Sequence, residues 1–184
     1  MRSVSCASPS ACTAVGVYTT FNPSASVALA ERWNGTTWAV QAMPAGDDVL
    51  FGVSCATPTT CTAVGESYTF EHVGPLAEEW RHGTWHVDKT PPVPSFLATL
   101  SGVACRSASA CAAVGGYINS AGVGVPLAEA WNGTTWSIQP TPSPRGGGSG
   151  FSGVSPTSAT SFTAVGGHVS GSQVLVTLAE TGPG

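Results

Sequence analysis

The chain has 184 residues, of which only 9% are charged and 42% are hydrophobic, and it contains 23 glycines and 14 prolines. So few charges with so much glycine and proline exclude a helical bundle, and the hydrophobic content excludes a disordered chain. The net charge is −4 and the basic residues are scattered, which argues against binding to nucleic acid. They are Arg2, Arg32, Arg81, Lys89, Arg106 and Arg145.

The first repeat unit contains four short segments of strand type separated by turn residues. Residues 3–6 (SVSC) and 12–16 (CTAVG) are expected to be its first two strands, and residues 29–33 (LAERW) its third. The Asn-Gly pair at 34–35 then predicts a hairpin into a fourth strand over 37–44 (TWAVQAMP). Short β-type runs with turn residues between them predict an all-β fold.

The same pattern returns in register along the rest of the chain. Cys6, Cys55 and Cys105 are 49 and 50 residues apart, and Pro156 takes the equivalent position 51 residues further on. Four strands in every 50 residues or so is the period of a β-propeller blade. We therefore expect a single propeller domain over residues 1–184, with a fourth blade that lacks its outer strand. The expected blades are approximately 1–49, 50–99, 100–150 and 151–184.

The incomplete fourth repeat bears on how the domain closes. Outer strands matter least for ring closure, so we expect a four-bladed unit that tolerates the gap. A segment of a larger ring is one alternative, and two chains that complete a ring together are another. An open arc would expose blade faces to water and favour self-association through the incomplete fourth blade.

The third repeat carries the most specific pattern. Residues 114–117 (VGGY) end a small apolar strand, Glu129 precedes Trp131, a turn leads to Trp136, and Pro142 lies in a proline-rich exit. This pattern resembles a kelch-type propeller blade. The cysteine-bearing repeats are also similar to repeats of secreted bacterial proteins. The resemblance covers nearly the whole chain, although the Gly-Gly pair is complete only in the third and fourth repeats.

Three cysteine pairs share a spacing of five intervening residues, and the fourth repeat replaces both members with Pro156 and Phe162. A buried free thiol can be lost singly, whereas joint loss is what a covalent bond predicts. We expect three disulfides, each worth roughly 2 kcal/mol in the chain-entropy model. Zinc is the alternative, but its ligand pairs usually lie two to four residues apart. The expected pairs are Cys6–Cys12, Cys55–Cys61 and Cys105–Cys111.

Disulfides indicate an oxidising compartment, so the chain is expected to be secreted or extracellular. It has no run of about 18 apolar residues, so no membrane span is expected. The first residues, MRSVSCAS, lack the apolar core of a signal peptide. Either such a peptide has been removed, or the chain is a piece of a longer protein.

Antiparallel strands place two of the four connections of each repeat at one end of the blade and two at the other. The first end carries the cysteine loops and the Asn-Gly turns, whereas all the variable connections gather at the second. A scaffold feature is needed in every blade but a site is needed once, so we expect a ligand at the variable end. For residues 66–72 (ESYTFEH), the loop with the most polar and titratable side chains, the alternative is a polar surface loop without a ligand. The candidate ligand-binding residues are Asp47, Asp48, Glu66, Tyr68, Glu71 and His72.

Two residue types recur at fixed positions and are expected to be structural. The repeated glutamates should face the packed side and accept hydrogen bonds from a neighbouring blade, with a cation-binding ring as the alternative. The repeated tryptophans should pack between blades, with stacking on sugars as the alternative. These residues are Glu31, Glu78, Glu129 and Glu180, with Trp38, Trp85 and Trp136.

Catalytic patterns are weak. His82 and His86 straddle a turn and a strand, so we expect them to be solvated rather than metal-binding. Kelch-like copper oxidases need a free cysteine, but every cysteine here is expected to be paired. Sialidase-type propellers need three converging arginines, but the arginines here do not recur at one level of the blades. No Ser-His-Asp set can be assigned either. We expect no cofactor and no metal, and favour a non-catalytic module that binds a protein or a glycan. A secreted enzyme, an accessory domain of one, and a purely structural surface repeat are the alternatives.

Overall fold

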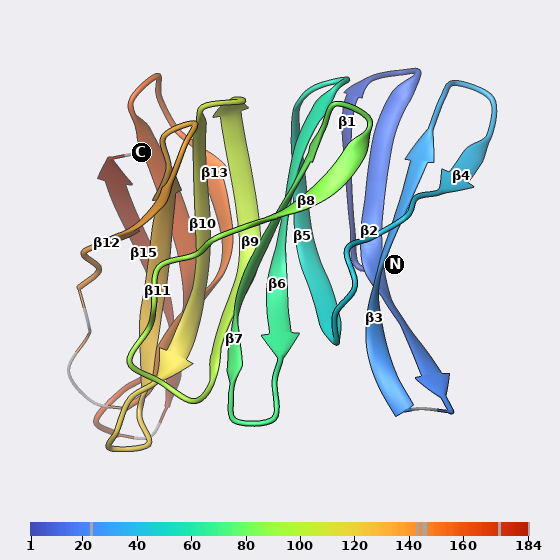
Figure 1. Cartoon of the computed structure of the whole chain (residues 1–184). Helices are drawn as coiled ribbons and strands as arrows, with labels where there is room; N and C mark the ends of the chain where they lie inside the picture. Colours follow the sequence, from blue (N-terminus) through green and yellow to red (C-terminus); the bar gives the residue numbers. More distant parts are fainter. Residues whose placement is uncertain (23, 143, 145–146, 173, 184) are drawn as a thin grey trace.

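The computed structural model describes all residues except 23, 143, 145–146, 173 and 184. The described part of the chain contains β-strands and no helix, which confirms the all-β prediction. The strands form four antiparallel sheets that stand side by side (Figure 1). Three sheets have four strands and the last has three, as the sequence predicted. The described residues include no helix long and apolar enough to cross a membrane.

In each sheet the strands pair in chain order, so each sheet is an antiparallel meander. Sheet 1 contains β1 (Ser3–Ser8), β2 (Ala11–Phe21), β3 (Ser24–Trp33) and β4 (Trp38–Val40). Sheet 2 contains β5 (Asp48–Thr57), β6 (Thr60–Tyr68), β7 (Val73–Arg81) and β8 (Thr84–Asp88). Sheet 3 contains β9 (Ala98–Ser107), β10 (Ala110–Ile118), β11 (Gly124–Trp131) and β12 (Trp136–Gln139). Sheet 4 contains β13 (Ser149–Pro156), β14 (Ser161–Val169) and β15 (Leu175–Pro183).

The glycine of the repeated Ala-Val-Gly segment has a steric origin. A Cβ atom added at Gly65 would lie 1.8 Å from the carbonyl oxygen of Val49, and one at Gly115 would lie 2.0 Å from that of Thr99. Next to both glycines the ladder to the inner strand is interrupted by a β-bulge. Glycine alone accommodates so close a backbone approach, so the repeat keeps it.

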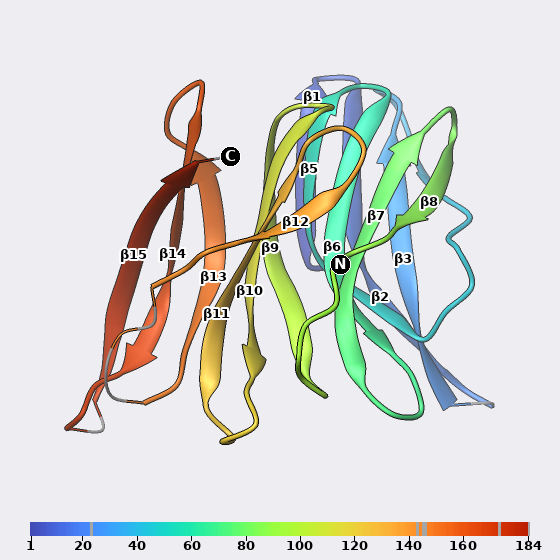
Figure 2. The ribbon, with the colours of Figure 1, turned by 60° about the vertical axis from the view of Figure 1, so that its left-hand side comes forward.

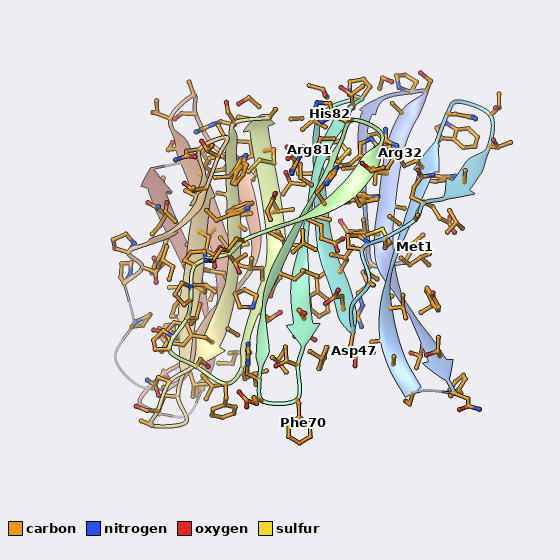
Figure 3. All side chains as sticks on the ribbon, viewed as in Figure 1. Met1, Arg32, Asp47, Phe70, Arg81 and His82 are labelled. Carbon is orange, nitrogen blue, oxygen red and sulfur yellow. A yellow bond between two sulfur atoms is a disulfide. The ribbon has the colours of Figure 1, made fainter. Side chains whose placement is uncertain are left out.

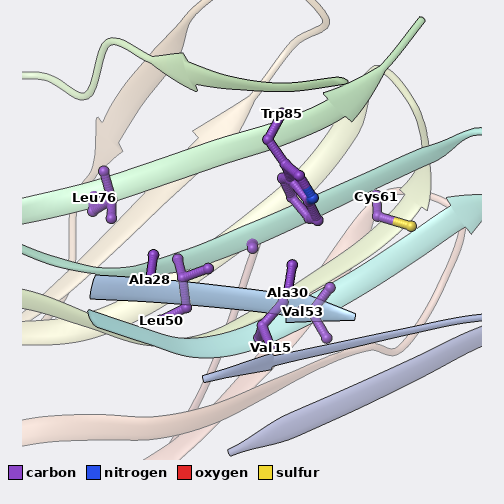
Figure 4. Close-up of a cluster of buried hydrophobic side chains, with 9 residues drawn as sticks. Val15, Ala28, Ala30, Leu50, Val53, Cys61, Leu76 and Trp85 are labelled. Atoms are coloured by element: carbon purple, nitrogen blue, oxygen red, sulfur yellow. The ribbon is translucent and has the colours of Figure 1, made fainter. Parts of the chain in front are cut away.

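The core lies between successive sheets. We call the side of a sheet that meets the following sheet its front face, and the opposite side its back face. On the front face of sheet 1, Val15 and Ala30 pack against Leu50, Leu76 and Trp85 on the back face of sheet 2 (Figure 4). Small side chains on one face thus receive large side chains from the next. The equivalent cluster between sheets 2 and 3 contains Val64, Ala77, Leu100, Leu127 and Trp136.

The three repeated tryptophans differ in burial. Trp85 and Trp136 are only 5% exposed and pack between sheets, as predicted. Trp38 is 44% exposed, contrary to that prediction. The reason is its place on the back face of sheet 1, which no preceding sheet covers in this structure.

The four sheets form an open arc, which corrects the expectation that they make a four-bladed ring by themselves. The principal contacts join sheet 1 to sheet 2, sheet 2 to sheet 3, and sheet 3 to sheet 4. Two views place sheets 1 and 4 at opposite ends of the arc (Figures 1 and 2). Large side chains fill the interfaces between sheets 1 and 2 and between sheets 2 and 3. None of the principal contacts among the described residues joins sheet 1 to sheet 4, so the four sheets span only part of a circle.

The predicted disulfides are present. Each joins two directly paired residues of the first two strands of its sheet, with S–S distances of 2.02, 2.08 and 2.06 Å. The serine before the cysteine links successive sheets as well. The Ser5 hydroxyl accepts a hydrogen bond of 2.9 Å from the backbone N–H of Cys55, and Ser54 accepts the equivalent bond of 2.9 Å from Cys105.

Sheet 4 has no disulfide, and an arginine from sheet 3 contacts its first turn. Phe162 occupies one of the cysteine positions and is buried. The guanidinium carbon of Arg106 lies 4.2 Å from the centre of this ring. Arg106 also donates hydrogen bonds of 3.3 and 3.4 Å to the carbonyl oxygens of Ser158 and Ser161. A cation–π contact and charged hydrogen bonds thus connect sheet 3 to the first turn of sheet 4.

Candidate functional site

The connections at the two ends of the strands differ, as the sequence predicted. At one end lie the β1–β2, β5–β6 and β9–β10 turns with the disulfides, together with the turns into β4, β8 and β12; we call it the stapled end. At the other lie the β2–β3, β6–β7, β10–β11 and β14–β15 hairpins and the chain that enters β5, β9 and β13; we call it the loop end. Figure 3 shows Arg81 and His82 near the stapled end and Asp47 and Phe70 near the loop end. Residues 23, 143, 145–146 (including Arg145) and 173 of these connections lie outside the described residues.

Three of the candidate residues form one cluster at the loop end. The Tyr68 hydroxyl donates a hydrogen bond of 2.5 Å to Glu66 Oε1, and the Tyr68 backbone N–H donates one of 2.8 Å to the carbonyl oxygen of Asp47. The Asp47 side chain accepts a bond of 2.7 Å from the backbone N–H of Ser26 in sheet 1. The hydrogen bond to Glu66, then burial and the negative charges of Glu66 and Asp47, raise the pKa of Tyr68 to about 12. The cluster is acidic and bridges sheets 1 and 2.

Asp48 lies apart from this surface cluster. Its side chain is buried, and its Oδ1 atom has no hydrogen-bond partner among the described residues. Its negative charge instead contributes to the raised pKa of the buried Glu78.

The last two candidates, Glu71 and His72, line a recess of about 580 Å³. One wall is the β6–β7 hairpin and the other is the connection that precedes β9, including Phe96. The hairpin is ordered by the Thr69 hydroxyl, which donates a bond of 2.9 Å to the carbonyl oxygen of His72. The connection is held by a bond of 2.9 Å from the Val73 N–H to the Phe96 carbonyl oxygen. We call this opening the loop-end recess.

The structure also reveals exposed aromatic residues at the loop end that the sequence analysis did not select. Phe21, Phe70 and Phe96 are all exposed, and Figure 3 shows the ring of Phe70 directed away from the molecule. A phenylalanine inside a variable connection, where no repeat position requires it, was the signal that could have identified them.

A second, apolar groove of about 430 Å³ lies between sheets 3 and 4. Phe151 and Phe162 of sheet 4 line it, together with Val114 and Ala128 of sheet 3. Between the other sheets, Trp85 and Trp136 of the outer strands are part of the equivalent clusters. The groove therefore corresponds to the place of the tryptophan that the three-stranded sheet 4 lacks.

The repeated glutamates face the packed side, but their predicted hydrogen bonds are absent. Glu78 and Glu129 are fully buried, and neither carboxyl has a partner among the described residues. The indole N–H groups of Trp85 and Trp136 are likewise unpaired there. Burial raises the pKa of Glu129 to about 8, and burial with the charges of two nearby aspartates raises that of Glu78 to about 8. A carboxyl that stays protonated avoids the cost of a buried charge.

The outer glutamates, Glu31 and Glu180, are only partly buried, because sheet 1 has no preceding sheet and sheet 4 has no outer strand. Among the described residues, no group of three histidine, cysteine, aspartate or glutamate side chains is placed to hold a metal ion. His86 shares a hydrogen bond of 2.8 Å with Thr84, and His82 occupies the turn before it with a φ of 52°.

No family model matches the sequence, and no curated protein matches it. The structure described as "YCF48 bound to D1 peptide" is similar, with a TM-score of 0.53 and 12% identity over 92% of this chain and 50% of that one. A fucose lectin from Kordia zhangzhouensis in complex with methyl-fucoside has a TM-score of 0.47 and 9% identity over 76% of this chain and 99% of that one. The present chain thus spans half the length of the YCF48 chain.

Repeated four-stranded antiparallel sheets and this likeness define a protein of the β-propeller type. At 12% identity the likeness to YCF48 shows the fold alone. The three disulfides suggest an oxidising environment for that fold.

Proposed function

We propose that the chain is an extracellular, non-catalytic binding module that takes a polypeptide or a glycan at its loop end. The observation that carries the proposal is the loop-end recess, where Glu71, His72 and an exposed Phe96 come together from two unlike connections. Polar groups and an aromatic ring in a preformed opening on a rigid sheet frame are typical of a binding site.

A polypeptide is the favoured ligand class. Exposed phenylalanine side chains on loops are typical anchors of protein interfaces, and three lie at this end. The acidic side chains of Asp47, Glu66 and Glu71 favour a ligand that carries basic residues. The YCF48 structure contains a D1 peptide, which supports a polypeptide ligand for a related fold.

A glycan is the second candidate, because exposed aromatic rings also stack on the apolar faces of sugars. Tyr68, which is partly exposed and hydrogen-bonded to Glu66, offers a ring and a carboxylate side by side for that purpose. We also propose that the blades are of the kelch type and that the chain comes from a secreted bacterial repeat protein.

The test is a screen of the intact chain against a displayed random-peptide library and against an immobilised glycan array. We expect a reproducible ligand from one of them, with basic residues if it is a peptide. Glu71→Ala and Phe96→Ala should each weaken its binding about tenfold, which corresponds to about 1.4 kcal/mol.

The matched control is Thr59→Ala, an exposed residue of the β5–β6 turn at the stapled end. It should leave the dissociation constant within twofold of the unmodified chain. Failure to find a ligand in either screen, or equal losses in all three variants, would argue against a loop-end binding site.

A further inference from the structure

The two outermost sheet faces of the arc are each left without a neighbour, and they are of opposite kinds. Sheet 1 presents a back face and sheet 4 presents a front face. Inside the chain, front and back faces meet three times, so the structure itself shows what each free face is suited to contact.

The free back face of sheet 1 carries the large residues that are buried at equivalent positions elsewhere. Val4 is 60% exposed, whereas Val53, which takes the same place in sheet 2, is 7% exposed. Trp38 and Met1 are also exposed, whereas Trp85 and Leu50 at the equivalent positions are buried. This face therefore resembles the back faces that a preceding front face covers inside the chain.

The free front face of sheet 4 carries the small residues that receive such a surface. Val165 is 51% exposed, although its counterpart Val15 in sheet 1 is fully buried. It pairs across the strands with Ala179, as Val15 pairs with Ala30. The serine that accepts the bond between sheets is also in place, because the exposed Ser155 corresponds to Ser5.

We propose that two copies of the chain associate head to tail, with the back face of sheet 1 in each copy packed on the front face of sheet 4 in the other. The contact extends an interface type that the chain already uses internally. Val4, Leu29 and Trp38 of one copy pack against Val165 and Ala179 of the other, as their equivalents do between sheets 1 and 2.

The internal interfaces also specify the polar bonds of this contact. Ser155 Oγ accepts a hydrogen bond from the backbone N–H of Cys6 in the second copy, as Ser5 and Ser54 accept from the cysteine of the following sheet. Thr163 meets Cys12 of that copy in the way that the Thr13 hydroxyl lies 3.4 Å from Cys61 Sγ. Both bonds fix the register between the copies.

Two such contacts close a ring with twofold symmetry. A heterologous interface gives a closed ring when its rotation completes a circle. In a single arc, sheets 1 and 4 lie at opposite ends (Figures 1 and 2).

The experiment is molar mass by light scattering after size-exclusion chromatography. Two copies of the 18.5 kDa chain give 37 kDa. Val4→Glu and Val165→Glu should each produce an 18.5 kDa monomer, because every contact uses both positions. Circular dichroism of each variant confirms that it remains folded.

The control is Val40→Glu. Val40 lies on the outer strand, and its counterparts Val87 and Ile138 stay exposed where a preceding sheet is present, so this variant should remain dimeric. Mixing Val4→Glu with Val165→Glu should restore a 37 kDa species, since one intact contact forms between the two variants. A monomeric unmodified chain, dimers in only one of the two variants, or a mass above two copies would overturn the proposal.

Discussion

Replacing Trp136 and Trp38 with alanine compares one repeat position with and without a covering sheet. The two residues are 5% and 44% exposed, so Trp136 hides 39 percentage points more of its surface. For a side chain that buries up to about 250 Å², this difference is about 100 Å², or about 2.5 kcal/mol at 25 cal/mol per Å². Both residues also contact a second tryptophan at similar distances, 5.5 and 5.7 Å between ring centres, so that part of the loss cancels.

We therefore expect Trp136→Ala to lower the free energy of unfolding by about 4 kcal/mol and Trp38→Ala by only about 1.5 kcal/mol. The measurement is urea unfolding followed by circular dichroism. Both changes are made in the Val165→Glu background, so that association between copies does not bury Trp38. Equal losses in the two variants would refute the assignment of these positions to a covered and an uncovered face.

Three further predictions concern the frame of the arc. Replacing Cys105 and Cys111 with serine should lower the free energy of unfolding by about 2 kcal/mol, measured by urea titration; an unchanged midpoint would show that the bond does not restrict the unfolded chain. Arg106→Ala should cost about 2 kcal/mol and raise amide hydrogen exchange in residues 157–161, and an unaltered exchange rate there would count against its bonds to that turn. The raised pKa of Glu129 means that its contribution to stability is complete below about pH 4.5 and is lost as the pH rises through about 8. Glu129→Gln should thus remove a decline on the order of 5 kcal/mol between those pH values, and an unaltered pH profile of unfolding would contradict a buried, protonated Glu129.

The fold followed from the sequence because its signals are local and repeated. The Asn-Gly turn, for example, is a hairpin in which Asn132 Oδ1 accepts bonds of 2.9 Å from the backbone N–H groups of Thr134 and Thr135. The joint loss of two cysteines in the fourth repeat likewise indicated a bond within one hairpin. Such features depend on a few neighbouring residues, and the repeat presents them several times.

Ring closure and burial could not be predicted in the same way, because they depend on the packing angle between sheets. The sequence pattern gives Trp38 and Trp136 the same role, and only the absence of a covering sheet separates them. The predicted hydrogen bonds of Glu78 and Glu129 were wrong for a similar reason. A polar residue that recurs in each repeat suggests a hydrogen bond in each repeat. A buried, protonated carboxyl without a partner gives the same sequence pattern, so the sequence does not distinguish the two.

The candidate site was predicted on the loop of residues 66–72 together with Asp47 and Asp48 of the preceding connection, and the structure divides these residues. Tyr68 and Glu66 bridge to sheet 1, Glu71 and His72 line the recess beside sheet 3, and Asp48 is buried. Residues a few positions apart on one hairpin face different neighbours, which chain position alone does not reveal. The wall that contains Phe96 comes from a connection more than twenty residues away.

Hydrogen exchange on the chain bound to the best ligand from the peptide or glycan screen tests the functional claim most directly. Protection confined to residues 66–74 and 90–98 at the loop end is the predicted result. Protection at the disulfide-bonded turns instead, with these two segments exchanging as fast as in the free chain, would contradict it.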